Sequence, residues 1–169
     1  GAGNRMRACL PYRVAPLAGI AACALALASA EVQCAVSVEE IEFPVADATD
    51  RYAAVSGVLR LPDSPRAALP AVLIVTSSPG FDGRGAFYAE ALGQAGIASL
   101  EVDMFQGRGL PASAMHNLPH AYQSLQYLAR HPRIDTQRIG IMGFSWGGAV
   151  AVLASSDELA RRYAGSELR

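Results

Sequence analysis

The order of apolar and polar residues predicts that the folded part of the chain begins with two β-strands. Residues 36–45 and 51–61 are β-type stretches, separated by the turn-prone sequence ADATD. In the second stretch, alternate positions carry apolar or small residues that share one face: Val55, Gly57, Leu59 and Leu61. This alternation predicts a strand with one buried face. Residues 62–65, PDSP, then break the strand.

A continuous apolar run follows and predicts a strand of a different kind. Residues 69–76, LPAVLIVT, do not alternate, which is typical of a parallel strand buried on both faces. Residues 77–85 contain glycine and proline and predict a loop. Residues 86–95 predict a helix that ends at Gly96. Helical spacing gives this helix an apolar face of three residues: Phe87, Ala91 and Leu92.

The remainder of the chain continues the alternation of strands and helices. Residues 97–103 and 138–144 predict two further buried strands, and residues 114–131 and 147–163 predict two helices. The first of these helices is amphipathic and carries Leu118, Leu125 and Leu128. Alternating strands and helices imply right-handed crossovers and a mostly parallel sheet covered on both faces, with the leading antiparallel pair at one edge. The predicted fold class is therefore α/β, with no strand after the last helix.

Composition narrows the function without identifying it. The chain has 169 residues, of which 51% are hydrophobic and 17% charged, and its formal net charge is −1. This length suits one domain with a sizeable core, and the composition excludes a mainly disordered chain. The balanced charge argues against nucleic-acid binding, because no basic stripe is present to neutralise phosphates.

The first 30 residues predict a secretory signal peptide. Arginines precede an apolar run, residues 14–30, whose last three residues, ASA, suit a signal peptidase. We expect cleavage after Ala30, a mature domain of residues 31–169, and export to the periplasm or the medium. One alternative is a membrane anchor, although a run of about 17 residues is at the short limit for crossing a bilayer. The other is a lipid anchor at Cys23.

Cysteine usage follows from that cleavage. Two of the three cysteines lie in the predicted signal peptide, which leaves Cys34 as the only cysteine of the mature domain. A single cysteine forms no internal disulfide, and no neighbouring residues suggest a metal site. We interpret Cys34 as a bystander near the new N-terminus.

The sequence Gly143-Phe144-Ser145-Trp146-Gly147 carries the clearest chemical signal. It matches G-x-S-x-G and falls between a predicted buried strand and a predicted helix, which is the context this motif requires. The sharp turn places Ser145 in a strained conformation, with its hydroxyl above the strand ends. Glycines flank it because side chains there would collide in the turn. Ser145 is therefore the candidate nucleophile.

Other interpretations of the glycine-rich segments are weaker. Ser145 could instead be a simple helix cap in a glycine-rich helix start packed on the sheet. The sequence GFDGRG, residues 80–85, follows a strand but lacks the spacing of a dinucleotide fingerprint. No Lys-Ser or Lys-Thr follows the glycines, which excludes a phosphate-binding P-loop.

The chain resembles the dienelactone hydrolase family. The likeness covers roughly residues 69–164 and is carried by four stretches: Phe87–Leu92, residues 95–103, Phe105 with Arg108-Gly109, and Asp135 leading into residues 138–148. The resemblance implies an α/β-hydrolase fold and hydrolysis of esters and lactones through a nucleophile–Asp–His triad, without metal or organic cofactor. The founding members use cysteine as nucleophile, whereas this chain has Ser145 like many of the broader family, so the family name indicates little about the substrate.

Two backbone N–H groups are candidates for stabilising the oxyanion of an acyl-transfer intermediate. The turn places the N–H of Trp146 beside the developing charge, and one such donor is worth about 3–4 kcal/mol of transition-state stabilisation. In related hydrolases a His-Gly pair often ends the strand that closes here at Thr76. Here Thr76 is followed by Ser77-Ser78-Pro79-Gly80. Ser78 is the tentative second donor, because Pro79 has no N–H, and an alignment shift of one or two residues remains an alternative.

The residues that would activate the serine do not follow it. A serine hydroxyl needs an adjacent base, and in α/β-hydrolases the triad runs Ser, Asp or Glu, then His. His116, His120 and His131 all precede Ser145, and we interpret them as solvated or capping side chains. The acidic residues after it, Asp157, Glu158 and Glu167, lie in the predicted helix or near the end. Asp103 ends a strand and is expected to organise the adjacent loop.

The sequence therefore predicts the N-terminal part of a serine-dependent hydrolase that acts on a small-molecule ester or lactone. We expect this stretch alone to be inactive, because a histidine and an acid beyond residue 169 would complete the triad. We also expect residues 31–169 to fold poorly or aggregate alone, because the nucleophile strand would leave an open sheet edge. Two alternatives stay open: a non-catalytic relative that serves as a binding or assembly module, and the same fold used for peptide cleavage or acyl transfer.

Overall fold

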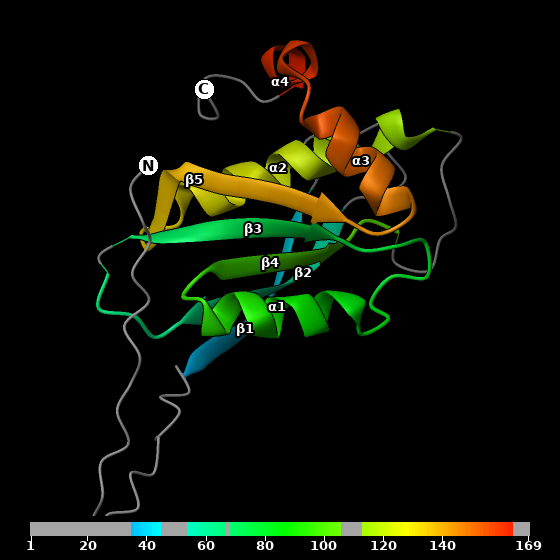
Figure 1. Ribbon diagram of the computed structural model, residues 1–169. Coiled ribbons are helices and arrows are strands. Elements are labelled where there is room, and N and C mark those ends of the chain that lie inside the picture. Colours follow the sequence, from blue (N-terminus) through cyan, green and yellow to red (C-terminus); the bar gives the residue numbers. More distant parts are fainter. Residues whose placement is uncertain (1–34, 45–53, 67, 106–112, 164–169) are drawn as a thin grey trace, which may run out of the picture. The chain divides into compact units, whose positions relative to one another are not determined.

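The computed structural model describes residues 35–44, 54–66, 68–105 and 113–163, and these form a five-stranded sheet with helices on both faces (Figure 1). The strand order is β1-β2-β4-β3-β5. The strands span β1 Val36–Pro44, β2 Ala54–Pro62, β3 Leu69–Val75, β4 Ala98–Asp103 and β5 Ile134–Gly143. The predicted signal peptide, residues 1–30, lies outside the described residues.

The pairing of the strands confirms the predicted topology. β3 pairs in parallel with β4 on one side and with β5 on the other, so that Leu73 lies opposite both Leu100 and Ile141. β1 and β2 form the antiparallel pair at one edge, and β2 joins the sheet through an antiparallel pairing with β4. The sheet is therefore mixed, with a parallel centre. This is the predicted α/β class.

The helices cover the two faces unequally. α1 (Arg84–Gln94) lies against β4 and β2 on one face, whereas α2 (Leu118–Arg130) and α3 (Trp146–Ala154) lie on the other (Figure 1). A short 3₁₀ turn, η1 (Ala114–Asn117), precedes α2, and α4 (Asp157–Tyr163) follows α3. No helix among the described residues has the length and apolarity that a bilayer crossing needs.

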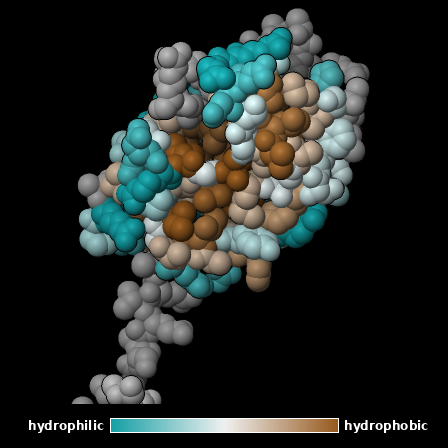
Figure 2. Space-filling model, turned by 45° about the horizontal axis from the view of Figure 1, so that its top comes forward, coloured by the Kyte–Doolittle hydropathy of each residue, from teal (hydrophilic) through white to brown (hydrophobic). Residues whose placement is uncertain are grey.

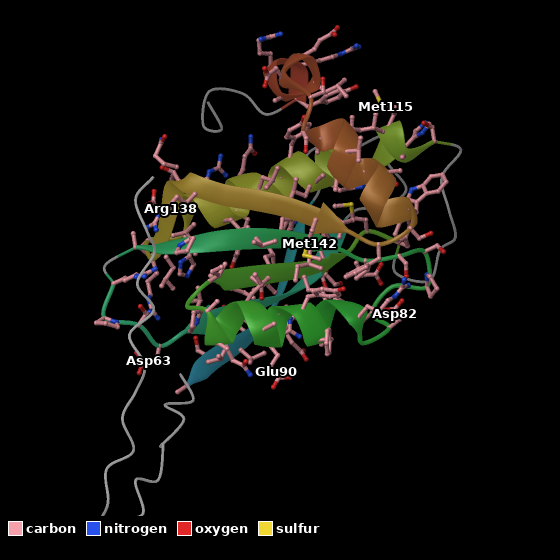
Figure 3. All side chains as sticks on the ribbon, viewed as in Figure 1. Asp63, Asp82, Glu90, Met115, Arg138 and Met142 are labelled. Atoms are coloured by element: carbon pink, nitrogen blue, oxygen red, sulfur yellow. The ribbon has the colours of Figure 1, made fainter. Side chains whose placement is uncertain are left out.

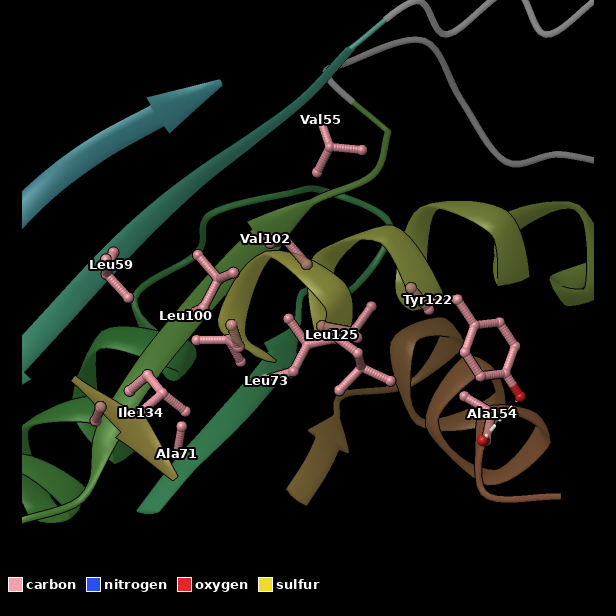
Figure 4. Close-up of a cluster of buried hydrophobic side chains, with 14 of the residues drawn as sticks. Val55, Leu59, Ala71, Leu73, Leu100, Val102, Tyr122, Leu125, Ile134 and Ala154 are labelled. Atoms are coloured by element: carbon pink, nitrogen blue, oxygen red, sulfur yellow. Dashed lines mark hydrogen bonds between the residues drawn. The ribbon is translucent and has the colours of Figure 1, made fainter. Parts of the chain in front are cut away.

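The main core lies between the sheet and α2 (Figure 4). The face predicted for the second strand is the buried one, since Val55, Gly57, Leu59 and Leu61 are all buried. All three leucines predicted on the amphipathic helix are buried too: Leu118, Leu125 and Leu128. Burial of each such side chain stabilises the fold by about 1.5–3 kcal/mol before the conformational entropy is counted. This layer holds the sheet that carries the functional loops.

The apolar face predicted for the first helix is wrong. In α1 the buried residues are Gly85, Ala89 and Gly93, while Phe87 is 70% exposed. Small residues face the sheet because α1 passes close to Glu101 of β4, and a Cβ at Gly85 would overlap that carboxylate. Burial raises the pKa of Glu101, and Arg60, whose Nη1 lies 3.2 Å from Oε2, opposes this shift.

The predicted end of this helix is correct. Gly96 follows the C-cap Ala95 with a φ of 73°, the left-handed conformation that favours glycine. Its N–H donates to the carbonyl of Gly93, and the N–H of Ile97 donates to the carbonyl of Leu92. These two bonds close the helix before β4 begins.

Two of the predicted helices are each divided. The predicted helix 114–131 begins with η1, and the α-helix starts only at Leu118, with Pro119 in its first turn, where its missing N–H is tolerated. The predicted helix 147–163 breaks after Ala154. There the Ser155 hydroxyl donates to the Ala151 carbonyl at 2.8 Å, a local bond that competes with helix continuation.

The two outer strands differ in character. β1 carries three glutamates, Glu39, Glu40 and Glu42, a common protection of an edge against further pairing. β5 was predicted as residues 138–144 and buried. It is longer and mostly exposed or half-buried, because no strand of the described part of the chain pairs with its outer side. Its last five residues, IGIMG, are uncharged.

An apolar hollow accompanies the β5 edge. It has a volume of about 460 Å³ and is lined by residues of β5, α2, α3 and α4, among them Ile139, Ile141, Leu125 and Ala154. Figure 2 brings the top of Figure 1 forward and shows apolar side chains gathered in a depression on that side. The edge thus combines unpaired backbone with exposed apolar surface.

We predict that the 169-residue chain self-associates through β5. Gly140→Lys should shift the chain toward monomer in sedimentation velocity, because a Cβ there meets nothing closer than Val72 Cγ2 at 4.0 Å, so the charge is added without a clash. Val38→Lys adds the same charge to the opposite edge, at an exposed position, and should leave the association unchanged. A monomeric, cooperatively melting wild-type chain would contradict this prediction.

Candidate active site

Ser145 occupies a strained turn between β5 and α3. Its φ of 51° and ψ of −114° make it the one residue other than glycine with a positive φ among those the structure describes. Such a conformation costs of order 1–3 kcal/mol and persists only where the surroundings impose it. Ser145 is exposed. The strand–turn–helix context predicted for G-x-S-x-G is present, with β5 ending at Gly143 and α3 beginning at Trp146.

The glycines of the motif are required by close backbone contacts. A Cβ at Gly143 would overlap the carbonyl of Gly147. A Cβ at Gly147 would lie too close to the carbonyl oxygens of Val75 and Thr76, at the end of β3. The N–H of Phe144 donates to the same Val75 carbonyl at 3.2 Å. The clash at Gly143 lies within the turn, as the sequence predicts, whereas the contact of Gly147 with the end of β3 was not predicted.

Both candidate oxyanion donors lie at the carboxyl ends of adjacent strands. Trp146 is the first residue of α3, so its N–H has no acceptor within the helix. Ser78 is half-buried and lies three residues after the end of β3, the strand against which the turn packs. The N–H of Ser78 donates to no acceptor among the described residues. The arrangement is compatible with both N–H groups serving one oxyanion.

A polar network that the sequence did not reveal fixes the loop after β3 to the start of α1. Arg84 donates through Nη2 to the Ser77 hydroxyl at 2.6 Å, and that hydroxyl donates to Asp82 Oδ2 at 2.8 Å. Arg84 Nε also donates to Asp82 Oδ2, at 3.0 Å. Asp82 lies on the loop just before α1 begins (Figure 3). Arg84 further stacks over the Phe144 ring, with Cζ 5.3 Å from the centroid.

This network connects the loop that carries Ser78 to the turn that carries Ser145. The Asp103 carboxylate packs closely against the same loop, since a Cβ at Gly80, whose φ is 83°, would overlap it. The carboxylate of Asp103 also accepts the N–H of Phe105 at 2.7 Å. The prediction that Asp103 organises the adjacent loop is confirmed. The contacts of Arg84 depend on side-chain direction and not on spacing, so no motif indicated them.

The histidines do not all behave as predicted. His116 is exposed, with Nδ1 3.2 Å from the Ser113 carbonyl, and His131 is the C-cap residue of α2, whose backbone N–H donates to the Leu128 carbonyl and whose Nδ1 accepts the N–H of Arg133. The interpretation of His120 as solvated or capping is wrong, because it is fully buried on the core side of α2. Burial lowers the pKa of His131.

The described acidic residues after Ser145 lie on the surface. Asp157 and Glu158 are exposed in the first turn of α4, where acidic side chains suit the helix dipole, and Glu167 is outside the described residues. Within the described ranges, no group of three His, Cys, Asp or Glu side chains is placed to hold a metal ion. Ser145 therefore stays the predicted nucleophile, and Trp146 and Ser78 stay the predicted oxyanion donors.

The chain belongs to the esterase FrsA-like family, whose model matches residues 18–164. This membership agrees with the α/β-hydrolase resemblance derived from the sequence. No curated protein sequence matches the chain.

Three solved structures share the fold. Esterase Est22 is 20% identical with a TM-score of 0.62, over 82% of this chain and 42% of its own. A hypothetical protein from Pseudomonas aeruginosa is 24% identical with a TM-score of 0.59, over 73% of this chain and 40% of its own. A dienelactone hydrolase-like promiscuous phosphotriesterase from metagenomic libraries is 19% identical with a TM-score of 0.58, over 72% and 54%. The chain thus spans about half, or less, of these proteins.

Gly147→Ala should destabilise the fold, because the added methyl group would meet the Val75 and Thr76 carbonyls. We expect a loss of roughly 1–3 kcal/mol in the free energy of unfolding, the usual cost of overpacking. Urea unfolding followed by fluorescence of Trp146, at a concentration below that of self-association, measures this. Gly140→Ala is the matched control, because its Cβ has room and its stability should not fall. Equal free energies of unfolding in the two variants would refute the close approach of Gly147 to the Val75 and Thr76 carbonyls.

The pKa of Asp82 should lie below its ordinary value of 3.8, because the Arg84 side chain, Ser77 and the Arg84 backbone donate to the ionised carboxylate. The stabilisation is then complete above pH 3.8 and is lost as the pH falls through the lower folded value. A carbon-13 NMR titration of the carboxyl measures this. Arg84→Gln should bring the midpoint back toward 3.8, whereas Arg138→Gln, in the separate pair with Asp135, should not move it. A wild-type midpoint at 3.8 or higher contradicts the network.

Proposed function

We propose that this chain provides the nucleophile half of a hydrolase for carboxylic esters or lactones, of the dienelactone hydrolase type. The observation that carries the proposal is Ser145, held at a positive φ between a parallel strand and a helix. Such strain is found where a fold presents a reactive side chain. Membership in an esterase family supports the reaction class.

In this reaction Ser145 attacks the carbonyl carbon of the ester. A base takes the hydroxyl proton as the new C–O bond forms, and the carbonyl oxygen becomes an oxyanion that the N–H groups of Trp146 and Ser78 stabilise. The tetrahedral intermediate collapses, the bond to the alcohol oxygen breaks, and the alcohol leaves with the proton. Water then attacks the acyl-serine through the same steps in reverse, which releases the acid and restores Ser145. A lactone gives one ring-opened product.

The base and its supporting acid come from outside this chain in our proposal. No histidine follows Ser145, and the described histidines His116 and His131 bond to backbone groups at the ends of η1 and α2. The chain alone is therefore proposed to be inactive, and catalysis requires the remainder of a hydrolase domain. Of the solved structures that share this fold, only 40% to 54% of each chain is covered by this one, which supports the same view.

The substrate is proposed to be a small ester or lactone met outside the cytoplasm. Export rests on the signal-peptide pattern of residues 1–30, with a lipid anchor at Cys23 as the minor alternative. Solved structures that share the fold include esterases, among them an acetyl xylan esterase from Paenibacillus sp. R4. No metal or organic cofactor enters the proposed mechanism.

Ser145→Ala should abolish turnover of p-nitrophenyl acetate by the complete protein that carries this sequence. The loss should reach about 10⁴-fold or more, as for removal of a catalytic nucleophile. Ser155→Ala is the matched control, because that serine lies at the other end of α3 and its hydroxyl donates to the Ala151 carbonyl of the same helix. Turnover that survives in Ser145→Ala would reject the proposed nucleophile. A complete protein that folds but never turns over esters would favour the binding-module alternative.

A further inference from the structure

A hydrogen bond joins the start of α2 to the residue that follows the nucleophile. The indole Nε1 of Trp146 donates to Asn117 Oδ1 at 3.0 Å. Asn117 is 1% exposed, and the two residues are 29 positions apart in the sequence. A buried amide oxygen and an indole N–H both need partners, and here each provides the partner of the other.

Asn117 does not perform the role that its position in the sequence favours. It is the N-cap residue of α2, where asparagine usually accepts a backbone N–H of its own first turn. Its backbone is instead in the right-handed helical region, continuing η1, and its side chain makes no cap bond. Pro119, in that first turn, has no N–H, so one backbone donor that would otherwise need a capping acceptor is absent. The amide is therefore available to Trp146.

The bond acts on the peptide group that carries the proposed oxyanion donor. Trp146 follows Ser145 directly, and the indole packs at the edge of the main core. With Nε1 held by Asn117, the direction of the Trp146 side chain is fixed, and with it the backbone on which the N–H is mounted. The strained φ of Ser145 needs surroundings that over-determine it, and this bond is one such constraint.

We infer that Asn117 is a positioning residue for catalysis: through the Trp146 indole it holds the Ser145–Trp146 peptide in the orientation that an oxyanion requires. The inference rests on the proposed function. Asn117 touches no reacting atom, so its effect is on the rate of the chemical step and not on substrate affinity. A misplaced donor weakens the transition state selectively, which lowers kcat while KM stays nearly constant.

A second bond between the same helices provides the matched control. Tyr122 donates from its hydroxyl to the Ala154 carbonyl at 3.0 Å, also from α2 to α3. Ala154 is the last residue of α3, whereas Trp146 is the first. Tyr122→Phe removes a buried interhelical bond of similar length far along the helix from Ser145. If such bonds only stabilise the helix pair, loss of either one has the same catalytic effect.

The test compares steady-state kinetics of the complete protein with p-nitrophenyl acetate in five variants, one of which is the control Tyr122→Phe. Asn117→Leu removes the acceptor, and Trp146→Phe removes the donor and keeps an aromatic ring. The double variant combines them, and Asn117→Asp keeps an acceptor oxygen at the same place. We expect Asn117→Leu and Trp146→Phe each to lower kcat about 10- to 100-fold, with KM changed less than twofold, as expected for a small misplacement at a reacting centre.

The double variant should be no worse than either single one, because both remove the same bond. Asn117→Asp should recover most of the lost kcat, and Tyr122→Phe should keep the wild-type kcat. Multiplying losses in the double variant, an unchanged kcat in Asn117→Leu, or an equal loss in Tyr122→Phe would each overturn the inference. Should Asn117→Leu fail to fold, Trp146→Phe and Asn117→Asp give the same decision.

The failure of this inference can be told apart from failure of the proposed function. If Ser145→Ala abolishes turnover and Asn117→Leu does not affect kcat, the hydrolase proposal stands and the role of Asn117 is rejected. If Ser145→Ala retains turnover, the proposed nucleophile is rejected first, and a kcat effect at Asn117 no longer supports oxyanion positioning.

Discussion

The close approach of backbone to backbone at the nucleophile turn is the constraint on which the remaining structure depends. Gly147 is the first-turn residue of α3 that faces the Val75 and Thr76 carbonyls, and only a residue without a side chain fits there. This contact brings the end of β5 against the end of β3. The loops that follow these two strands therefore begin next to one another. Core packing by α2 then keeps the two strands in register.

Polar side chains add further restraints to the turn that carries Ser145. On the α1 side, Arg84 links the loop after β3 to the ring of Phe144. On the α2 side, Asn117 holds the indole of Trp146. The residues before and after Ser145 are therefore anchored to opposite faces of the sheet, and the serine between them has little freedom to relax. The strain in its backbone is sustained by contacts from both helical layers.

The sequence predicted the order of elements because hydrophobic periodicity and glycine placement are local signals, as at Gly96 and in the alternation of β2. It failed where a local pattern does not determine packing. Gly85 and Gly93 carry no hydrophobic signal, yet both lie on the buried face of α1, where a Cβ at Gly85 would overlap Glu101 and a Cβ at Gly93 would approach Val36. In the site, G-x-S-x-G indicated Ser145, and its strained turn is present. The Asn117–Trp146 bond escaped notice because it joins residues distant in sequence.

The two outer strands, β1 and β5, differ in how readily a further strand could pair with them. A strand that paired with the free edge of β1 would meet its glutamates, and their charge disfavours such pairing. The last five residues of β5 carry no charge, and the hollow described above lies next to their outer edge. A further strand is therefore expected to pair with β5 and not with β1. Ser145, the proposed nucleophile, lies two residues past the end of β5 and therefore beside the edge at which a further strand would pair.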